Sequence, residues 1–543
     1  MSAIEPRSGP PIHRIFRGKF DGSRIRLTTR RGRCDDVPMP APSLPELWLC
    51  GVAANPAAPS DVLLRLLAPQ ARAAWTVLCQ ERSLPADVVD AALSHPERAV
   101  RRAVARNRYV APEQRGRLVD DPDALVRAAL ASGPHLDVVE PLPDDVLEAL
   151  LTARDDDRPG QLLNANEIRQ ELEFSRQIPA SFQQGMIDHP HPDLRAQATG
   201  LWLSLTPAQR EALLADPDPE VSKAARRNAR VLDPAAMEAD LPEEDCHGRA
   251  LLLRNYAISQ AVAERCLAEQ RDLLSLAANP YTPADIVARL ARDPDPTVRR
   301  RVAARADLDP GLLADLAEDA DEAVRTRARV QPFPRTRWQC VAIDQVVGLA
   351  SKCTAHTFCC VGPVGGMFRE QEAGWYEECA VSPEPLLHRV AASYAWLSGE
   401  SVRSLAADPD PLVRHLLALN HPLAPSAIVL DAFVAVPRQR PYLLTLSRLP
   451  RTGLGHLLDH ADPEVRALAA ADRGLAEPPV RLLSDPDPLV RRAAAANPLL
   501  PVELVSSLLD DPELAEGAAA NPVLPAERLH RLLDRGGVPG TAT

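Results

Sequence analysis

The chain has 543 residues, and its 25% charged and 45% hydrophobic residues are ordinary for a soluble protein. Its net charge of −12 and its 4% aromatic content argue against a surface that binds nucleic acid. No stretch approaches the ~18 consecutive apolar residues of a membrane span, and the first residues lack the apolar core of a signal peptide. We therefore expect a cytoplasmic protein, in which the ten cysteines are thiols or metal ligands rather than disulfides.

Residues 1–43 form a basic N-terminal arm ahead of an acidic body. The segments on either side of Asp21-Gly22 alternate well enough to predict a small hairpin, and the alternative is a partly disordered tail. This arm is the one feature that favours a nucleic-acid or other anionic partner. Residues 1–33 contain only two acidic residues, Glu5 and Asp21, and nine basic residues, a net charge of +7. The basic residues are Arg7, Arg14, Arg17, Lys19, Arg24, Arg26, Arg30, Arg31 and Arg33.

The 54 prolines recur at regular places in the chain. The string Asp-Pro-Asp-Pro begins at Asp216, Asp293, Asp408 and Asp485, and an asparagine or a residue in its place follows each short apolar run. The last five of these asparagine positions are 27, 25, 25 and 24 residues apart. A repeat of about 25 residues therefore covers most of residues 44–535. The predicted asparagine positions are Asn55, Gln80, Asn107, Ser132, Asn228, Asn255, Asn279, Asn420, Ser447, Asp472, Asn497 and Asn521.

Each unit predicts two short helices. In the unit that begins at Asp485, the Asp487 carboxylate can cap the first turn, and Pro488 loses no hydrogen bond at the first helical position. Asn497 precedes a proline, which ends the first helix. Pro501 then begins a second helix over 501–511, whose leucines and valine share one face.

A single unit buries too few aliphatic side chains to offset the entropy of ordering about 25 residues. Stacked units share their apolar faces, so the sequence predicts a solenoid with capping ends. The final helix is expected to stop at Gly536-Gly537, ahead of a tail over 536–543.

A Val-Arg pair recurs in the first helix of many units. The arginine lies four residues after the capping aspartate, which suits an Asp–Arg pair within the helix or a ladder between neighbouring units. An anion-binding stripe is the alternative, disfavoured because acidic partners are built into the repeat. The pairs are Val126-Arg127, Val298-Arg299, Val324-Arg325, Val413-Arg414, Val465-Arg466 and Val490-Arg491.

The unit D-P-D-P-x-V-R-x-x-x-A-x-N-P-x-x-P-x-x-L-x-x-L-L resembles the leucine-rich repeat variant family, a bacterial relative of armadillo and HEAT solenoids. The resemblance implies an all-α fold, a right-handed α-solenoid in which each unit pairs an α-helix with a 3₁₀-like helix. The match is closest at 281–330, 403–425 and 460–535 and is degenerate at 155–200. The family's N-terminal iron–sulfur motif is not carried over, because only Cys34 and Cys50 precede the repeats here.

The repeat lapses between two predicted arrays, 44–334 and 386–535, in a Cys-rich insert at 335–385. Thiolate and imidazole ligands suit zinc or an iron–sulfur cluster, and a metal stabilises a segment without its own core. The spacing matches no standard ligand motif, so a redox thiol pair and simple burial of small apolar cysteines stay open. The candidate ligands are Cys340, Cys353, His356, Cys359, Cys360 and Cys379.

His189-Pro190-His191-Pro192 looks like a metal-binding pair, but it lies 27 residues before Asp216. We interpret it as the capping string with histidine in place of aspartate.

No phosphate-binding loop, zinc-hydrolase motif or nucleophile elbow is found in the sequence, so no enzyme is predicted. The leading hypothesis is a scaffold that binds a protein partner through the solenoid surface. A metal-dependent redox or sensor protein that uses residues 340–379 is the first alternative. A HEAT-like nucleic-acid binder is the second.

Overall fold

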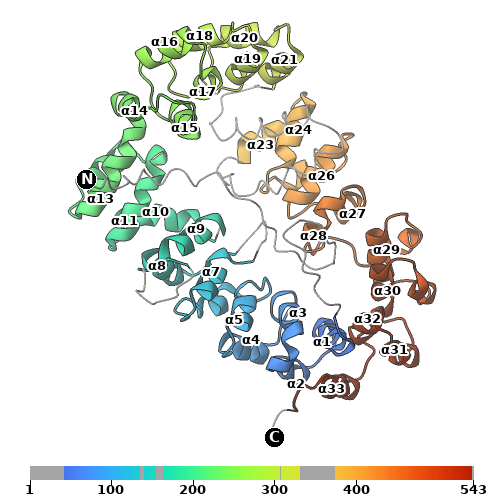
Figure 1. The fold of residues 1–543 in the computed structure, drawn as a ribbon. Coiled ribbons are helices and arrows are strands. Elements are labelled where there is room, and N and C mark those ends of the chain that lie inside the picture. The colour runs from blue at the N-terminus through green and yellow to red at the C-terminus, as the bar shows by residue number, and fades with distance from the viewer. Residues whose placement is uncertain are drawn as a thin grey trace, which may run out of the picture. The chain divides into compact units, whose positions relative to one another are not determined.

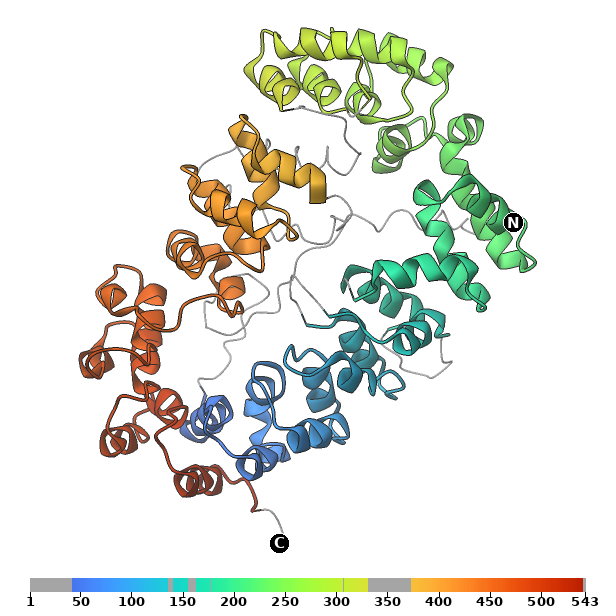
Figure 2. The same ribbon diagram turned by 180° about the vertical axis from the view of Figure 1, so that it is seen from behind.

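The computed structural model describes residues 42–134, 140–154, 163–175, 177–305, 307–330 and 373–540. Every regular element within these ranges is a helix (Figures 1 and 2), as predicted for an all-α repeat protein. No helix in the same ranges combines the length and the apolar character that a bilayer crossing needs. The basic arm up to residue 41, with its predicted hairpin, lies outside the described residues.

The contacts between residues divide the chain into two compact units. Unit 1 takes its described residues from 196–330 and 374–391, in the middle of the sequence. Unit 2 is assembled from both ends of the sequence, 42–195 and 392–540.

Unit 2 holds the helices of the first and last repeats. Its N-terminal half contains α1 (Leu44–Ala54), α2 (Ser60–Arg65), η2 (Pro69–Ala74), α3 (Trp75–Gln80), α4 (Ala86–Leu93), α5 (Arg98–Ala105), α6 (Pro112–Gly116), α7 (Ala124–Ser132), α8 (Asp144–Thr152), α9 (Ala165–Ser175), α10 (Ala180–Gly185), η3 (Met186–Asp188) and α11 (Pro192–Ala198), which reaches the unit boundary. Its C-terminal half contains α25 (Gly399–Ala406), α26 (Pro411–Asn420), α27 (Ser426–Ala435), η8 (Pro437–Gln439), α28 (Arg440–Leu443), η9 (Gly455–Leu457), α29 (Pro463–Ala470), η10 (Val480–Ser484), α30 (Pro488–Ala495), α31 (Val502–Leu508), α32 (Ala515–Ala519) and α33 (Ala526–Arg535).

Unit 1 holds the central repeats. Its helices are η4 (Thr199–Ser204), α12 (Pro207–Leu214), α13 (Pro219–Ala229), η5 (Arg230–Leu232), α14 (Pro234–Asp240), α15 (His247–Asn255), α16 (Gln260–Ala268), α17 (Leu273–Ala278), α18 (Ala284–Leu290), α19 (Pro296–Ala303), α20 (Pro310–Ala317), α21 (Glu322–Arg329), α23 (Ala373–Ala380) and α24 (Pro385–Ala392).

Helices in equivalent positions of successive repeats form layers. The first helices of neighbouring repeats pack on one another, as α3, α5, α7 and α9 do in unit 2 and α15, α17, α19 and α21 do in unit 1. In unit 1 one buried apolar core extends from Met237 on α14 to Ala328 on α21. The second helix is α-helical in α4, α18, α31 and α33, so the α plus 3₁₀ pairing implied by the family resemblance is not general in these residues.

The predicted capping chemistry is confirmed. Asp487 Oδ1 accepts a hydrogen bond from the Leu489 amide at 2.8 Å, at the start of α30. The preceding Asp485 accepts from the Asp487 amide at 2.9 Å, which fixes the turn into the helix. The prolines therefore mark helix starts.

The histidine string plays the same part, as interpreted from the sequence. His189 Nδ1 accepts from the His191 amide at 3.1 Å, and His191 Nδ1 accepts from the Asp193 amide at 3.2 Å. Each ring nitrogen accepts the backbone hydrogen bond that an aspartate carboxylate accepts in other repeats. These two histidines therefore stabilise the turn into α11.

Four slot asparagines, each four positions before the N-cap of the second helix, tie their repeat to the one before it: Asn107, Asn279, Asn497 and Asn521. Asn255 holds the same position but bonds Leu251 in its own helix. Asn497 Nδ2 donates to the carbonyls of Ala470 (2.7 Å) and Asp472 (2.8 Å), and its Oδ1 accepts from the Leu499 amide. Asn497 is fully buried. One side chain thus satisfies three backbone groups that the apolar stack shields from water.

Several predicted slot positions are wrong. His421, four residues before the N-cap Pro425, contacts the Leu397 carbonyl, whereas Asn420 bonds Leu416 in its own helix. Gln80 is likewise replaced: the Arg82 guanidinium donates to two carbonyls of the preceding repeat.

A third substitute lies in the degenerate segment. Gln177 Nε2 donates to the carbonyls of Leu130 and Ala131 at 2.9 and 2.8 Å. Any donor of suitable reach can therefore fill the role of the slot asparagine.

The sequence predicted a solenoid with capping ends, and the structure corrects this for the first and last repeats. Helix α1 packs against α32 and α33 (Figure 1), so the last repeat lies on the first. The final helix does stop at Gly536, and Gly537 adopts a φ of +73°, as expected for a glycine C-terminal stop. Beyond it, Val538 is buried, so this part of the predicted tail belongs to the packed repeat.

Candidate functional site

The predicted metal site lies almost wholly outside the described residues. Cys340, Cys353, His356, Cys359 and Cys360 fall in 331–372, and only Cys379 is described, buried on α23. Within the described ranges no three His, Cys, Asp or Glu side chains are grouped as metal ligands would be. The metal hypothesis for 340–379 therefore stays a prediction.

Metal content tests this hypothesis directly. We expect anaerobically purified protein to contain about one equivalent of zinc or an iron–sulfur cluster. The variant in which Cys353, Cys359 and Cys379 are all replaced by serine should lose this metal. Elemental analysis and absorbance near 400 nm measure it. Serine at Cys246, an exposed cysteine outside the insert, is the control and should leave the metal content unchanged. Folded, metal-free, colourless protein would contradict the hypothesis.

Two other described cysteines are poor candidates for chemistry. Burial raises the pKa of the Cys79 thiol to about 12 and raises the pKa of Cys266. A thiol with a raised pKa holds little of the reactive thiolate at neutral pH. Both side chains therefore act as small apolar residues of the stack.

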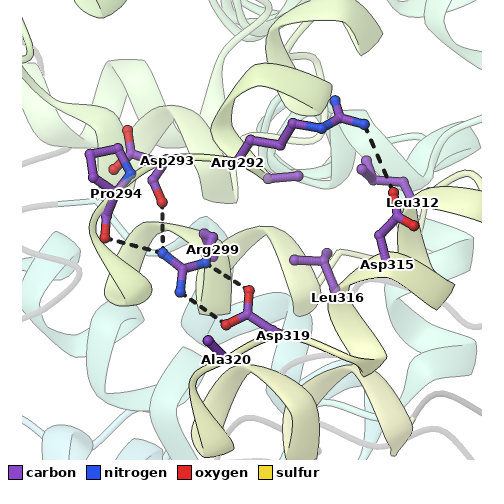
Figure 3. Close-up of a pocket in the computed structure, with 10 residues that line it drawn as sticks. Arg292, Asp293, Pro294, Arg299, Leu312, Asp315, Leu316, Asp319 and Ala320 are labelled. Carbon is purple, nitrogen blue, oxygen red and sulfur yellow. Dashed lines mark hydrogen bonds and ion pairs between the residues drawn. The ribbon is translucent and has the colours of Figure 1, made fainter.

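A hollow of about 420 Å³ lies between two repeats of unit 1 (Figure 3). At its centre the Arg299 guanidinium makes two hydrogen bonds to the Asp319 carboxylate, at 2.7 and 2.9 Å. Arg299 also donates to the carbonyls of Asp293 and Pro294. Hydrogen bonding to Asp319 raises the pKa of Arg299, and the same contact lowers the pKa of Asp319. Both charges are thus already engaged.

A hollow of about 470 Å³ occupies the same place in a repeat of unit 2. There Arg466 bonds Asp485 at 3.0 Å through two nitrogens and donates to the carbonyls of His460 and Ala461. Arg101 bonds Asp121 in the same way. These pairs confirm the predicted ladder, a series of Arg–Asp bridges between neighbouring repeats. The same arginines are therefore not available as an anion-binding stripe. The hollow is a recurrent product of the repeat, so it is a weak candidate for a ligand site.

The better candidate is a row of large apolar side chains on the turns between helices. We call this position, two residues before the N-cap of the second helix, the turn position. In slot-asparagine repeats the slot side chain accepts the amide of the turn residue, as Asn107 does for Tyr109 at 2.8 Å and Asn279 for Tyr281 at 2.8 Å. In unit 2, large apolar or aromatic residues occupy it at Tyr109, Trp396, Leu423, Leu499 and Val523, which we call the turn-position row. Tyr281 holds the same position in unit 1.

Three of these side chains are well exposed in unit 2. Tyr109 is 48% exposed, Trp396 is 41% exposed and Leu423 is 65% exposed. Trp396 and Leu423 stand in consecutive repeats, and the Trp396 ring packs edge-on against the buried Tyr394 ring at 5.3 Å. Rigid, exposed apolar side chains at a fixed turn are the usual anchors of protein–protein contacts.

Sequence reasoning missed the turn position. A signal was present, because most of these residues lie two positions before a proline or serine at the start of the second helix, as Leu423 does before Pro425. Tyr109 instead precedes the N-cap Ala111.

No protein-family model matches the chain, and no curated protein matches it. Among solved structures, one match is an engineered protein whose crystal structure comes from the Northeast Structural Genomics Consortium. The similarity covers 89% of this chain and 99% of that chain, at 14% sequence identity and a TM-score of 0.12. A similarity at this level supports no conclusion about fold or function.

Proposed function

We propose that this protein is a non-enzymatic α-solenoid scaffold that binds another protein through the turn-position row. The finer architecture is part of the proposal: a right-handed superhelix of the leucine-rich repeat variant type, interrupted by the Cys-rich insert. One observation carries it: exposed apolar side chains recur at one fixed position of the repeat. The recurrent arginines Arg101, Arg299 and Arg466, in contrast, are already paired with aspartates of the next repeat.

The chemistry of the row defines the kind of partner. Trp396, Leu423 and Tyr109 offer apolar area with little side-chain entropy to lose on binding, and Arg108 lies over the Tyr109 ring at 4.6 Å. Such a row fits a partner that presents apolar side chains at intervals along a helix or an extended segment.

Replacing Trp396 and Leu423 together by serine is expected to weaken partner binding by at least about tenfold, since anchors of this type carry more than about 1.4 kcal/mol. The measurement is quantitative cross-linking and mass spectrometry in the native lysate, followed by titration with the identified partner. Leu203 and Val480, at 47% and 48% exposed, lie outside the row, so their double serine variant is the matched control. Equal binding by both variants would refute the role of the row.

A further inference from the structure

We propose that the first and last repeats form a clasp, an interface that holds unit 2 closed and can be exchanged with a second copy of the chain. The clasp comprises α1 and α2 on one side and α32, α33 and residues 536–540 on the other. It goes beyond the scaffold proposal and does not depend on it.

The clasp contains the same slot hydrogen bonds as a joint between neighbouring repeats. Asn55 Nδ2 donates to the carbonyls of Ala519 (3.1 Å) and Asn521 (2.8 Å). Asn521 Nδ2 in turn donates to Ala495 (2.9 Å) and Asn497 (2.7 Å). The acceptors are equivalent in both cases, namely the slot residue of the preceding repeat and the residue two before it. The series of slot hydrogen bonds, which we call the slot ladder, thus continues from the last repeat to the first repeat.

The helix packing is equivalent as well. A Cβ added to Gly51 would press on the Glu516 carbonyl oxygen and come within 2.6 Å of the Ala519 Cβ. A Cβ added to Gly517 would meet the Arg492 carbonyl and the Ala495 Cβ in the same way. Gly51 and Gly517 both stand four residues before their slot asparagine, so one glycine lets the first helices approach closely in each joint.

The clasp also has contacts of its own. Trp48 Nε1 donates to the Leu509 carbonyl at 2.7 Å, and the Arg535 guanidinium lies 4.1 Å from the Trp48 ring centroid. The buried Arg65 donates to the carbonyls of Val538 (2.8 Å) and Pro539 (3.1 Å) and bonds Asp534 at 2.5 Å. These bonds fix residues 538 and 539 against α2.

The covalent path explains why this joint can exchange when others cannot. Among the described helices of unit 2, the other packed pairs belong to one repeat or to repeats adjacent in sequence, so the connecting turn holds them together. The clasp instead joins Asn55 to Asn521, which lie 466 residues apart in the sequence. Nothing covalent keeps these two faces together locally once they part.

The chemistry of the two clasp faces indicates what would bind them once the clasp opens. They are heterologous, because the α1 face packs on the α32 face and each chain carries one of each. The opened surfaces would expose Leu49, Val52, Ala515, Ala518 and Ala519, all buried in the closed form. The surface that covers them best is the complementary face of another copy, since it supplies the same hydrogen bonds.

Complementation between two full-length variants tests this. Gly51→Leu blocks the N-terminal face and leaves the C-terminal face intact, whereas Ala519→Leu does the reverse. Each variant alone should be monomeric, with faster amide exchange in both α1 and α33. A mixture at equal concentrations should form heterodimers joined by one intact clasp, exceeding either homodimer by about tenfold in native mass spectrometry.

The matched control is Gly517→Leu mixed with Ala495→Leu, which blocks an internal joint of the same geometry. This mixture should stay monomeric because the intervening turn keeps the repeats together. Gly51→Ala is the milder substitute should Gly51→Leu not fold. Monomers in the clasp mixture despite rapid exchange, heterodimers in both mixtures, or unchanged exchange in α1 and α33 would each overturn the proposal.

Discussion

Replacing Asn521 by alanine is expected to lower the free energy of unfolding by about 3 kcal/mol, and to raise amide exchange in α30 and α32 before other helices. The Asn521 side chain is fully buried and bonds the carbonyls of Ala495 and Asn497 and the amide of Val523. Alanine leaves these backbone groups without their partner, and a buried unsatisfied group costs about 1–3 kcal/mol. Urea unfolding monitored by circular dichroism, with hydrogen exchange by mass spectrometry, measures both effects.

Asn228→Ala is the matched control. The Asn228 side chain is only half-buried, and it donates to the Thr199 hydroxyl at 2.8 Å. Its loss should cost about 1 kcal/mol. If both variants unfold alike, the slot ladder is not a principal source of stability.

The local features of the repeat were readable from the sequence because they depend on neighbours in the chain. The caps at Asp487 and the stop at Gly536 follow from residues within one turn of helix. The Arg466–Asp485 bridge spans 19 residues and was one of two arrangements that the spacing allowed. Its geometry selected between them, since a guanidinium reaches the next repeat with two parallel bonds.

The slot residue was harder to predict from the sequence in repeats where a side chain other than asparagine makes its hydrogen bonds. His421, Arg82 and Gln177 replace asparagine because the stack requires a donor aimed at two carbonyls or one, whatever side chain carries it. Counting back four residues from the second helix's N-cap identifies His421 correctly, whereas searching for asparagine selects Asn420.

The clasp was not predictable from the period. A repeat of about 25 residues shows which units are neighbours in sequence, while Asn55 and Asn521 lie 466 residues apart. An uncapped first repeat was the available physical signal. Leu49, Val52 and Ala53 of α1 form an apolar face with no preceding repeat in the sequence to cover it.

Neutralising the ladder aspartate, Asp485→Asn, is expected to cost about 1.5–3 kcal/mol of unfolding free energy at pH 7. The Arg466 and Asp485 side chains are only 15% and 7% exposed, so the remaining guanidinium loses a charge-assisted partner in a shielded place. Asp459→Asn is the control in the same hollow. The Asp459 side chain is 79% exposed and its partner Arg481 is 60% exposed, so their ion pair should contribute about 0–1 kcal/mol. Equal losses would show that burial does not set the strength of the bridge.

The same bridges set an acid limit on stability. Hydrogen bonds from Arg466 and Arg299 lower the pKa of Asp485 and of Asp319 in the folded state. A carboxyl with a lowered folded pKa contributes stability that is complete above its unfolded pKa of about 3.9. That contribution is lost as the pH falls through the folded pKa. The melting temperature should therefore be nearly level above about pH 5 and fall steeply below about pH 4, less steeply in Asp485→Asn, because that variant has one such proton fewer to take up.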